Sequence, residues 1–318
     1  MHHRYQLVEG RIHNSTCEIN VAEHCNLSCR GCSHLSPIMG KYFVEPTEVL
    51  ADLSLLARHY RVDQVRLLGG EPLLHPDLLT VISAVRTSGI TERVTLTTNG
   101  LLLARMPIEL WEAVDTIELS MYPGHSPQPT QFAQIDARAR EHGVEFLPAR
   151  VDKFRQSYTE VRIDNPELVQ RVFSSCKIAH QWRCHTVAHG RLYRCPQSYF
   201  LPKILGEHTG GGPDVDGITI GDDDAFGDRL LAFLNAHSPL ASCANCLGTA
   251  GRLVPHVQIR RSEFRDPQKS PAAAMVSQRQ LMPGLWAPGR KPLSSLYRRV
   301  RRRVAGHRHP SDQPGMPA

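Results

Sequence analysis

This sequence of 318 residues lacks long hydrophobic runs. A transmembrane helix needs about 20 consecutive apolar residues, and no stretch of the chain approaches that length. The opening segment, MHHRYQLVEGRIHNST, also lacks the apolar run of a signal peptide. These absences exclude a membrane span and predict a cytoplasmic protein.

The net positive charge is confined to the C-terminal segment. The chain has a net charge of +6, but residues 260–318 alone hold thirteen Lys and Arg against three Asp and Glu. We expect residues 259–318 to be a basic, Pro- and Arg-rich disordered tail, with one basic helix at 293–304. Such a tail suits nonspecific contact with phosphates. Because no interleaved aromatic residues or helix-turn-helix pattern accompany it, specific nucleic-acid recognition is not expected.

Nine cysteines stand out in a chain that is expected to stay in a reducing compartment. Thiols remain reduced there, so clustered cysteines indicate metal binding or catalysis rather than disulfides. The segment EHCNLSCRGCSH places Cys25, Cys29 and Cys32 in the spacing C-x3-C-x2-C. Three chemistries are open: a disulfide, a zinc site completed by His24 or His34, or an iron–sulfur cluster held by all three thiols.

Residues 15–149 alternate between strand-like and helix-like segments. The expected strands are 15–22, 63–70, 93–100, 115–122 and 144–149, and the expected helices are 46–60, 76–89 and 131–143. This alternation predicts an α/β fold with βαβ units and a parallel sheet, which is either open or closed into a barrel. Such folds place their chemistry in the loops after the strands. The cysteine loop, GGEP (69–72), TTNG (97–100) and SMYPG (120–124) all occupy such loops.

Together these segments resemble the radical S-adenosylmethionine (SAM) superfamily. The C-x3-C-x2-C loop is similar to its signature, LLGGEPLLHPDL (67–78) to its GGEP motif, and TLTTNG and IELSMYP to its later SAM-contacting strand ends. The resemblance implies a lead-in at 1–14 and a radical SAM core at 15–160, folded as a partial (β/α)6 TIM-like barrel. One departure is Gly31, at a position that is usually aromatic and packs on adenine; the adenine contact is then expected elsewhere, at Leu35.

The resemblance also implies the cofactors. Three thiolates hold three irons of a 4Fe–4S cluster, and the fourth iron is left open for the amino and carboxylate groups of SAM. An external one-electron donor, such as flavodoxin or ferredoxin, reduces the cluster, and SAM then yields a 5′-deoxyadenosyl radical that removes a hydrogen atom from the substrate. The implied SAM-binding residues are Gly69, Gly70, Glu71, Pro72, Thr98, Asn99 and Ser120. For Thr98, Asn99 and Ser120, ordinary turn chemistry is an open alternative.

The later cysteines form a second group in CKIAHQWRCHTVAHGRLYRCP (176–196) and CANC (243–246). These segments could form a zinc ribbon. They also resemble the SPASM/twitch extension of radical SAM enzymes, which implies an auxiliary 4Fe–4S domain at 161–258. No cysteine follows Cys246, so the shorter twitch form with one cluster fits better. The implied ligands are Cys195, Cys243 and Cys246, with Cys176 or Cys184 as the fourth; the spacing favours Cys176.

The leading functional hypothesis is a radical SAM oxidoreductase or epimerase acting on a small polyhydroxylated molecule, such as a sugar, an aminocyclitol or a nucleoside. Cys17 and Cys184 are spare thiols, and each is either a small buried hydrophobe or a hydrogen-atom donor to a substrate radical. A donor would indicate an epimerase, whereas an auxiliary cluster without one fits two-electron oxidation. The sequence identifies no catalytic residue.

Two alternatives remain. The first is a maturase that modifies a ribosomally made peptide; a built-in leader-binding module is not expected, because about fifteen residues precede the first strand. The second is a non-catalytic iron–sulfur or zinc protein that binds nucleic acid through the basic tail.

Overall fold

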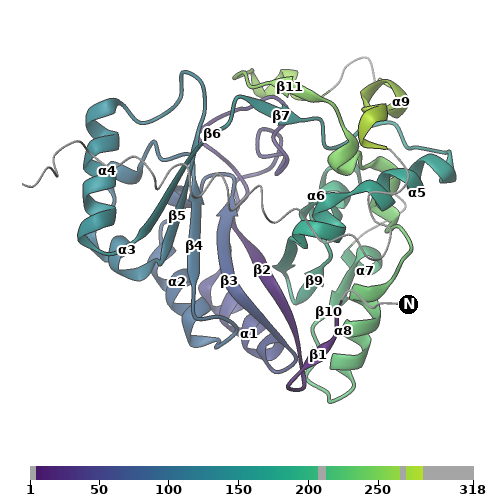
Figure 1. The fold of residues 1–318 in the computed structure, drawn as a ribbon, viewed down its shortest axis with the longest axis horizontal. Helices are drawn as coiled ribbons and strands as arrows, with labels where there is room; N and C mark the ends of the chain where they lie inside the picture. Colours follow the sequence, from purple (N-terminus) through teal and green to yellow (C-terminus); the bar gives the residue numbers. More distant parts are fainter. Residues whose placement is uncertain (1–4, 207–212, 266–269, 282–318) are drawn as a thin grey trace, which may run out of the picture. The chain divides into compact units, whose positions relative to one another are not determined.

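The computed structural model describes residues 5–206, 213–265 and 270–281 (Figure 1). These residues belong to a single unit by their contacts. The basic helix expected at 293–304 lies outside the described residues.

A nine-stranded sheet forms the centre of the described chain. Five neighbouring strands run parallel in chain order: β2 (Arg11–Ala22), β3 (Tyr60–Gly69), β4 (Val94–Thr98), β5 (Thr116–Met121) and β6 (Glu145–Arg150). The connections between them carry α1 (Pro46–Ala57), α2 (Leu78–Thr87), α3 (Ile108–Ala113) and α4 (Pro129–Glu141). A parallel pair needs such a crossover, so the predicted α/β class with a parallel, partial TIM-like sheet is confirmed.

The other strands extend the sheet beyond β2. Strand β8 (His185–Ala188) pairs parallel with β2 and is followed by the antiparallel strands β9 (Arg191–Tyr193) and β10 (Gly217–Thr219), while the two-residue β1 (Leu7–Val8) also pairs with β2. The order β10-β9-β8-β2-β3-β4-β5-β6 does not close into a barrel within the described residues. The sixth parallel strand is therefore β8, from the later part of the chain, and does not follow β6 as a sequential (β/α)6 barrel would require.

The segment after β6 leaves the main sheet. Strand β7 (Lys153–Arg155) pairs antiparallel with β11 (Leu253–Pro255) in a separate two-stranded sheet. In Figure 1 this small sheet lies beyond the carboxyl ends of the parallel strands.

The main core lies between the sheet and helices α1–α4. Side chains alternate along a strand, and Cys17, Ile19 and Val21 of β2 enter this core together with Leu53 and Leu56 of α1. Helix α1 ends at Ala57, earlier than predicted, because the following residues turn into β3. Cys17 is fully buried here, so its thiol faces the helices and behaves as a small hydrophobe.

Several elements were not expected from the sequence pattern. Helix α3 has six residues, too few for a helical period to be recognised. The others are α5 (Pro166–Ser175), α6 (Pro196–Leu205) and α7 (Pro213–Asp216). Helix α8 (Phe226–Asn235) lies within the helix that the sequence pattern predicts at 222–237 and is shorter than it.

The predicted disorder from residue 259 onward is wrong for the described residues up to 281. Helix α9 (Ala272–Met275) lies in this segment. Ala272, Val276 and Leu281 are buried and pack in one hydrophobic cluster with Leu247. A few apolar side chains, spaced without clear periodicity, are enough to fix the segment because they fill one cluster.

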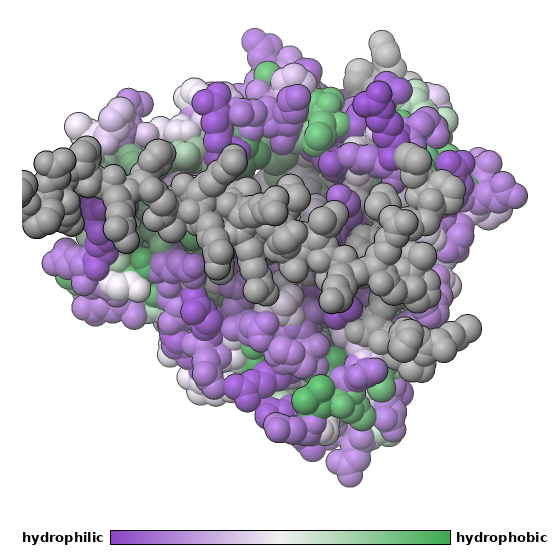
Figure 2. Space-filling model, in the orientation of Figure 1, coloured by the Kyte–Doolittle hydropathy of each residue, from purple (hydrophilic) through white to green (hydrophobic). Residues whose placement is uncertain are grey.

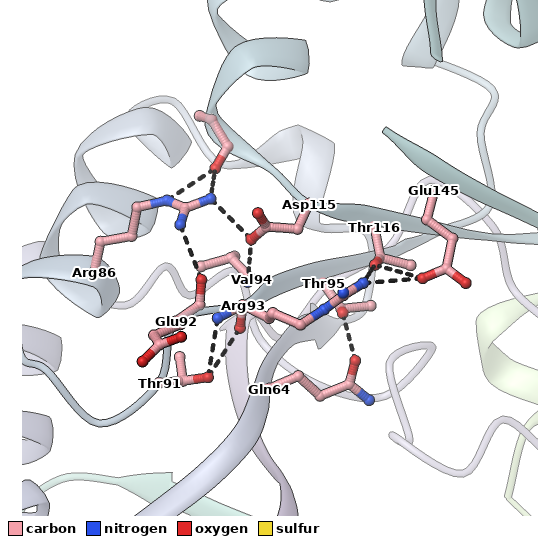
Figure 3. A network of polar contacts seen from close by, with 11 residues as sticks. Gln64, Arg86, Thr91, Glu92, Arg93, Val94, Thr95, Asp115, Thr116 and Glu145 are labelled. Atoms are coloured by element: carbon pink, nitrogen blue, oxygen red, sulfur yellow. Dashed lines mark hydrogen bonds and ion pairs between the residues drawn. The ribbon is translucent and has the colours of Figure 1, made fainter. Parts of the chain in front are cut away.

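A polar network ties the amino ends of β4, β5 and β6 together (Figure 3). Arg93 donates hydrogen bonds to Thr116 Oγ1 at 3.0 Å and to Glu145 Oε2 at 2.9 Å. Asp115 accepts from the Val94 backbone at 2.7 Å and from Arg86 at 2.9 Å. This edge is opposite to the one where such folds carry their chemistry, so we assign the network to stability.

The visible face of the molecule is mainly hydrophilic, with small separate hydrophobic patches (Figure 2). Within the described residues, no helix is both long enough and apolar enough to cross a bilayer. Exposed large hydrophobic side chains are scattered over the described surface: Leu7, Val8, Ile108, Val161, Trp182, Val215, Leu253 and Val257.

His185 of β8 is hydrogen-bonded to Tyr60 of β3 and to Tyr5. Its ring is buried, with Nδ1 at 2.6 Å from the Tyr60 hydroxyl and Nε2 at 2.8 Å from the Tyr5 hydroxyl. We expect Tyr60→Phe to lower the free energy of unfolding by about 1–3 kcal/mol, because it removes a hydrogen bond from a buried polar group. Urea unfolding at matched iron content measures this change, and a loss below about 0.5 kcal/mol would contradict the proposed role of His185.

Candidate functional site

The motifs singled out in the sequence meet at one edge of the sheet. The cysteine loop (residues 23–32) follows β2, the GGEP turn (69–72) follows β3, and TTNG (97–100) spans the end of β4. Ser120 lies near the end of β5. Because β2–β5 are parallel neighbours, their carboxyl ends are adjacent, and the structure thus brings these loops together as predicted.

The three thiols of the cysteine loop share one largely buried site. Burial raises the pKa of Cys25 and of Cys29 to about 12 each. Charge on the neighbouring thiols adds to this effect: Cys29 and Cys32 act on Cys25, and Cys32 acts on Cys29. The three sulfurs therefore lie close enough to interact electrostatically.

Hydrogen-bond donors point at these sulfurs. The backbone N–H of Leu27 lies 3.4 Å from Cys25 Sγ, and the Gln258 side-chain amide lies 3.0 Å from Cys29 Sγ. Burial raises the pKa of Cys32, while the backbone of residues 34–36 opposes the rise. Donors of this kind stabilise thiolates, the form in which cysteine binds metal.

The donor set fits an iron–sulfur cluster better than a single zinc ion. Zinc ligands converge on one atom at about 2.3 Å, whereas cluster cysteines each bind a different iron and lie farther apart. The histidines considered as zinc ligands pack on rings instead, His24 on Phe43 and His34 on Phe200. Burial lowers the pKa of His34 to about 4.

Two glycines allow the GGEP turn to lie against the cysteine loop. A Cβ on Gly70 would lie 1.9 Å from the carbonyl oxygen of His24, and a Cβ on Gly69 would lie 2.1 Å from that of Ala22. Gly69 also has a φ of +134°, which favours glycine. The Gly70 N–H donates to the Ala22 carbonyl at 2.6 Å. The close approach that the structure shows is to the backbone of the chain around the cysteine loop, and the approach to a ligand stays a prediction.

Glu71 joins the GGEP turn to the end of β4. Its side chain is fully buried, and its carboxylate accepts hydrogen bonds from Thr98 Oγ1 at 2.6 Å and from the backbone N–H groups of Asn99 at 2.9 Å and Leu73 at 3.1 Å. Burial raises its pKa to about 7, although the three hydrogen bonds oppose the rise. Glu71 therefore positions the loops, and a direct contact with SAM stays a prediction. Pro72 is buried at the start of the next turn.

The TTNG residues combine turn chemistry with contacts to the cysteine loop. Thr98 Oγ1 accepts from Gly100 N, and Asn99 Oδ1 accepts from Leu101 N, each at 3.0 Å. The Asn99 amide nitrogen also donates to Asn26 Oδ1 at 2.7 Å and lies 3.8 Å from Cys25 Sγ. Thr98 and Asn99 thus each accept a hydrogen bond within the turn, as the turn interpretation predicts. Asn99 also contacts the cysteine loop at the candidate metal centre.

The expected adenine contact at Leu35 is not supported. Leu35 is fully buried in a hydrophobic cluster with Phe200. A Cβ on Gly31 would lie 3.4 Å from Phe154 Cβ, so the loop faces β7 at this point. Tyr122 is one aromatic residue near the three thiols, and their charges add to the burial that raises its pKa.

The cysteine loop is also tied to helix α6. Glu23 is buried and accepts hydrogen bonds from the Tyr199 hydroxyl and from Lys203 Nζ, both on α6. Helix α6 starts directly after Cys195. This contact links the loop that holds the first three thiols to a helix that begins at the second cysteine group.

Four of the later cysteines line a single cavity. Cys176 caps the end of α5, Cys195 precedes α6, and Cys243 and Cys246 lie in and after the short helix at Ala241–Asn245. Burial raises the pKa of each thiol, and charge on the neighbouring thiols contributes at Cys195, Cys243 and Cys246. The cavity is lined by Val172, Phe173, Cys176, Ala179, Arg194, Cys195, Leu240, Cys243, Cys246 and Gly248.

This second donor set fits a four-thiolate cluster. The largely apolar lining excludes water, and Arg194 supplies a positive charge that offsets thiolate charge. Cys184 does not line the cavity, and its thiol interacts with Glu18, whose pKa it lowers against the effect of burial. The structure thus groups Cys176 with Cys195, Cys243 and Cys246, in agreement with the spacing argument.

The face of the sheet opposite α1–α4, called here the inner face, is polar. Glu18 of β2, Arg66 of β3 and Glu118 of β5 form a charged row across it, with Arg66 at 3.4 Å from Glu18 and at 3.1 Å from Glu118. Three polar atoms of this face are buried and have no hydrogen-bond partner among the described residues: Arg66 Nε, Asn20 Oδ1 and Asn20 Nδ2. The sequence pattern contained a signal for this face, because Asn14, Thr16, Glu18 and Asn20 alternate along β2.

Part of this chain is similar in sequence to known proteins. The family model of the Radical SAM superfamily matches residues 19–126. Molybdenum cofactor biosynthesis protein 1 of Bos taurus is 34% identical over 135 residues, which cover 42% of this chain and 21% of that protein. The GTP 3′,8-cyclase of Moorella thermoacetica is 32% identical over 97 residues, 30% of each chain. This chain thus spans less than a third of the length of these curated relatives.

Among solved structures, that of BtrN in complex with AdoMet and 2-DOIA is similar to this chain. It is 18% identical, with a TM-score of 0.42, and the match covers 74% of this chain and 94% of that chain.

The buried carboxylate of Glu71 gives a pH-dependent prediction. Its pKa rises from 4.5 to about 7 on folding, so between these values the folded state holds the extra proton and stability falls as pH rises. Relative to Glu71→Gln, we expect the wild-type protein to lose up to about 1.4 kcal/mol of unfolding free energy per pH unit in this window. Urea unfolding of the metal-free proteins between pH 5 and pH 8 measures this, and parallel pH profiles would contradict it.

Proposed function

Since residues 19–126 of this chain match the family model of the Radical SAM superfamily, we propose that the protein removes a hydrogen atom from a small polyhydroxylated substrate, giving dehydrogenation or epimerisation. A 4Fe–4S cluster with bound SAM supplies the radical chemistry in such a domain. The protein binds and orients the reactants and keeps water and stray side chains away from them. We further propose a cytoplasmic location and an external electron donor such as flavodoxin or ferredoxin.

Two sets of cysteines would hold the clusters. Cys25, Cys29 and Cys32 would bind the cluster that takes SAM, and Gly69, Gly70, Glu71, Pro72, Thr98, Asn99 and Ser120 would surround the cofactor. The auxiliary 4Fe–4S cluster would be held by Cys176, Cys195, Cys243 and Cys246, in a twitch-like extension at 161–258. Their common cavity supports this second assignment.

The proposal about the substrate rests on buried polar groups of the inner face. A buried polar group without a partner costs about 1–3 kcal/mol, and the amide of Asn20 and Nε of Arg66 are such groups among the described residues. Asn20 lies two residues before the end of β2, close to the cysteine loop. A molecule with several hydroxyl groups placed there would satisfy these atoms.

The charge of the inner face narrows the substrate class. The single positive charge of Arg66 lies between the carboxylates of Glu18 and Glu118. A nucleoside triphosphate, which the name GTP 3′,8-cyclase implies for the relatives, would meet negative charge at this row. A neutral or amine-bearing substrate, such as an aminocyclitol or an amino sugar, suits it better.

The reaction outcome depends on Cys184. The interaction of this thiol with Glu18 supports a position beside the inner face, unlike that of Cys17. A hydrogen atom passed from the thiol to a substrate radical completes an epimerisation and leaves a sulfur radical that needs one electron and one proton. An oxidation instead releases a proton and a second electron, and a cluster at the auxiliary cysteines would accept that electron. The placement of Cys184 favours epimerisation.

Anaerobic reconstitution with iron, sulfide, SAM and a reductant tests the proposal. We expect 5′-deoxyadenosine from the wild-type protein and none above background from Cys29→Ala. Deuterium at a ring carbon of a sugar, aminocyclitol or nucleoside should move into 5′-deoxyadenosine. Solvent deuterium in the product would identify epimerisation, and a carbonyl product would identify oxidation.

Other outcomes of the same experiment would reject the proposal. Hydrogen transfer from a peptide would indicate the maturase alternative. Intact clusters without SAM cleavage would favour the non-catalytic nucleic-acid-binding alternative.

Iron content tests the auxiliary ligands. Two 4Fe–4S clusters give about eight irons per chain, and we expect Cys176→Ala to hold about four while Cys184→Ala keeps about eight. Iron analysis with Mössbauer spectroscopy measures both variants, and Cys184 is the matched control because it is a neighbouring thiol outside the cavity. The reverse pattern would assign the fourth ligand to Cys184.

A further inference from the structure

A segment late in the chain pairs with the cysteine loop. The Arg30 N–H donates to the Val257 carbonyl at 2.9 Å, and the Ile259 N–H donates to the Ser28 carbonyl at 2.9 Å. Cys29 and Gln258 form an antiparallel bridge between these hydrogen bonds. Residues 256–259, called here the strap, therefore lie along the loop as a short strand.

The strap fixes the orientation of the Gln258 side chain. The backbone N–H of Ser28 donates to Gln258 Oε1 at 2.6 Å. An N–H group cannot donate to an NH2 group, so this contact identifies the oxygen of the amide and leaves the nitrogen on the other side. That nitrogen lies 3.0 Å from Cys29 Sγ.

Aromatic packing holds the strap in place. His256 stacks on Tyr122 with ring centroids 4.7 Å apart and an interplanar angle of 12°, and it also packs against Phe154 at 5.4 Å. His256 Nε2 lies 3.2 Å from Cys29 Sγ. Val257, which lies between His256 and Gln258 in the sequence, is 40% exposed. The strap therefore turns its polar residues, His256 and Gln258, toward the loop.

We propose that Gln258 is a positioning residue that makes the cluster at Cys25, Cys29 and Cys32 easier to reduce. The potential of an iron–sulfur cluster depends on its net charge and on the hydrogen bonds to its sulfurs. An N–H donor at Cys29 Sγ stabilises the extra negative charge that the cluster gains when it accepts one electron from a flavodoxin- or ferredoxin-type donor. No bond is formed or broken in this step. The inference rests on the proposed function, because it requires that cluster.

An EPR-monitored redox titration of the reconstituted full-length protein tests the proposal. The relevant cluster is the one whose EPR signal changes when SAM is added. We expect Gln258→Leu, which removes the donor, and Gln258→Glu, which keeps an oxygen for Ser28, to lower the reduction potential. At a fixed solution potential the ratio of reduced to oxidised cluster should fall several-fold, and a tenfold fall corresponds to 59 mV for one electron.

Val257→Thr is the matched control in the same strap, because Val257 contacts the loop through its backbone; its potential should equal that of the wild-type protein. Unchanged potentials in both Gln258 variants would overturn the proposal. Loss of the cluster from both variants, with retention in Val257→Thr, would also overturn it and would show that Gln258 retains the cluster instead. A wild-type protein with no SAM-responsive cluster would reject the proposed function itself.

Discussion

Two glycines let the loop after β3 lie directly against the backbone of the cysteine loop after β2. With any side chain at Gly70, its Cβ would overlap the His24 carbonyl, and the two loops would have to separate. Glu71 then links the same turn to the end of β4, and Asn99 links that strand end back to Asn26. The arrangement of the three thiols therefore depends on backbone packing and on a fully buried carboxylate, in addition to the cysteines themselves.

The later part of the chain completes this site. Strand β8 joins the main sheet next to β2, so the segment that carries the second cysteine group shares its scaffold with the first. Glu23 meets Tyr199 and Lys203 of α6. Any change in the position of α6 would thus act on both groups of thiols.

Much of the fold followed from the sequence because its signals were local. The alternation of strands and helices from 15 to 149, and the loops at the strand ends, required only periodicity and turn residues. The resemblance to the twitch extension implied the grouping of the later cysteines, and the spacing favoured Cys176 over Cys184 within it. The partnership of β8 with β2 could not be predicted, since a four-residue strand carries little pattern and its place depends on tertiary contacts. The same holds for α3, for the ordered segment up to Leu281, and for Gln258, whose position two residues after His256 marks no motif.

The contact between Gln258 and Cys29 joins residues that are 229 positions apart in the chain. During synthesis the three early cysteines leave the ribosome long before the segment that covers them. A contact of such sequence separation cannot form before both segments have been synthesised, so during that interval Cys29 lacks its contact with Gln258. Iron inserted before residue 258 has been translated would bind to a cysteine loop without its Gln258 contact. Iron inserted afterwards would bind to a loop in which that contact can already form.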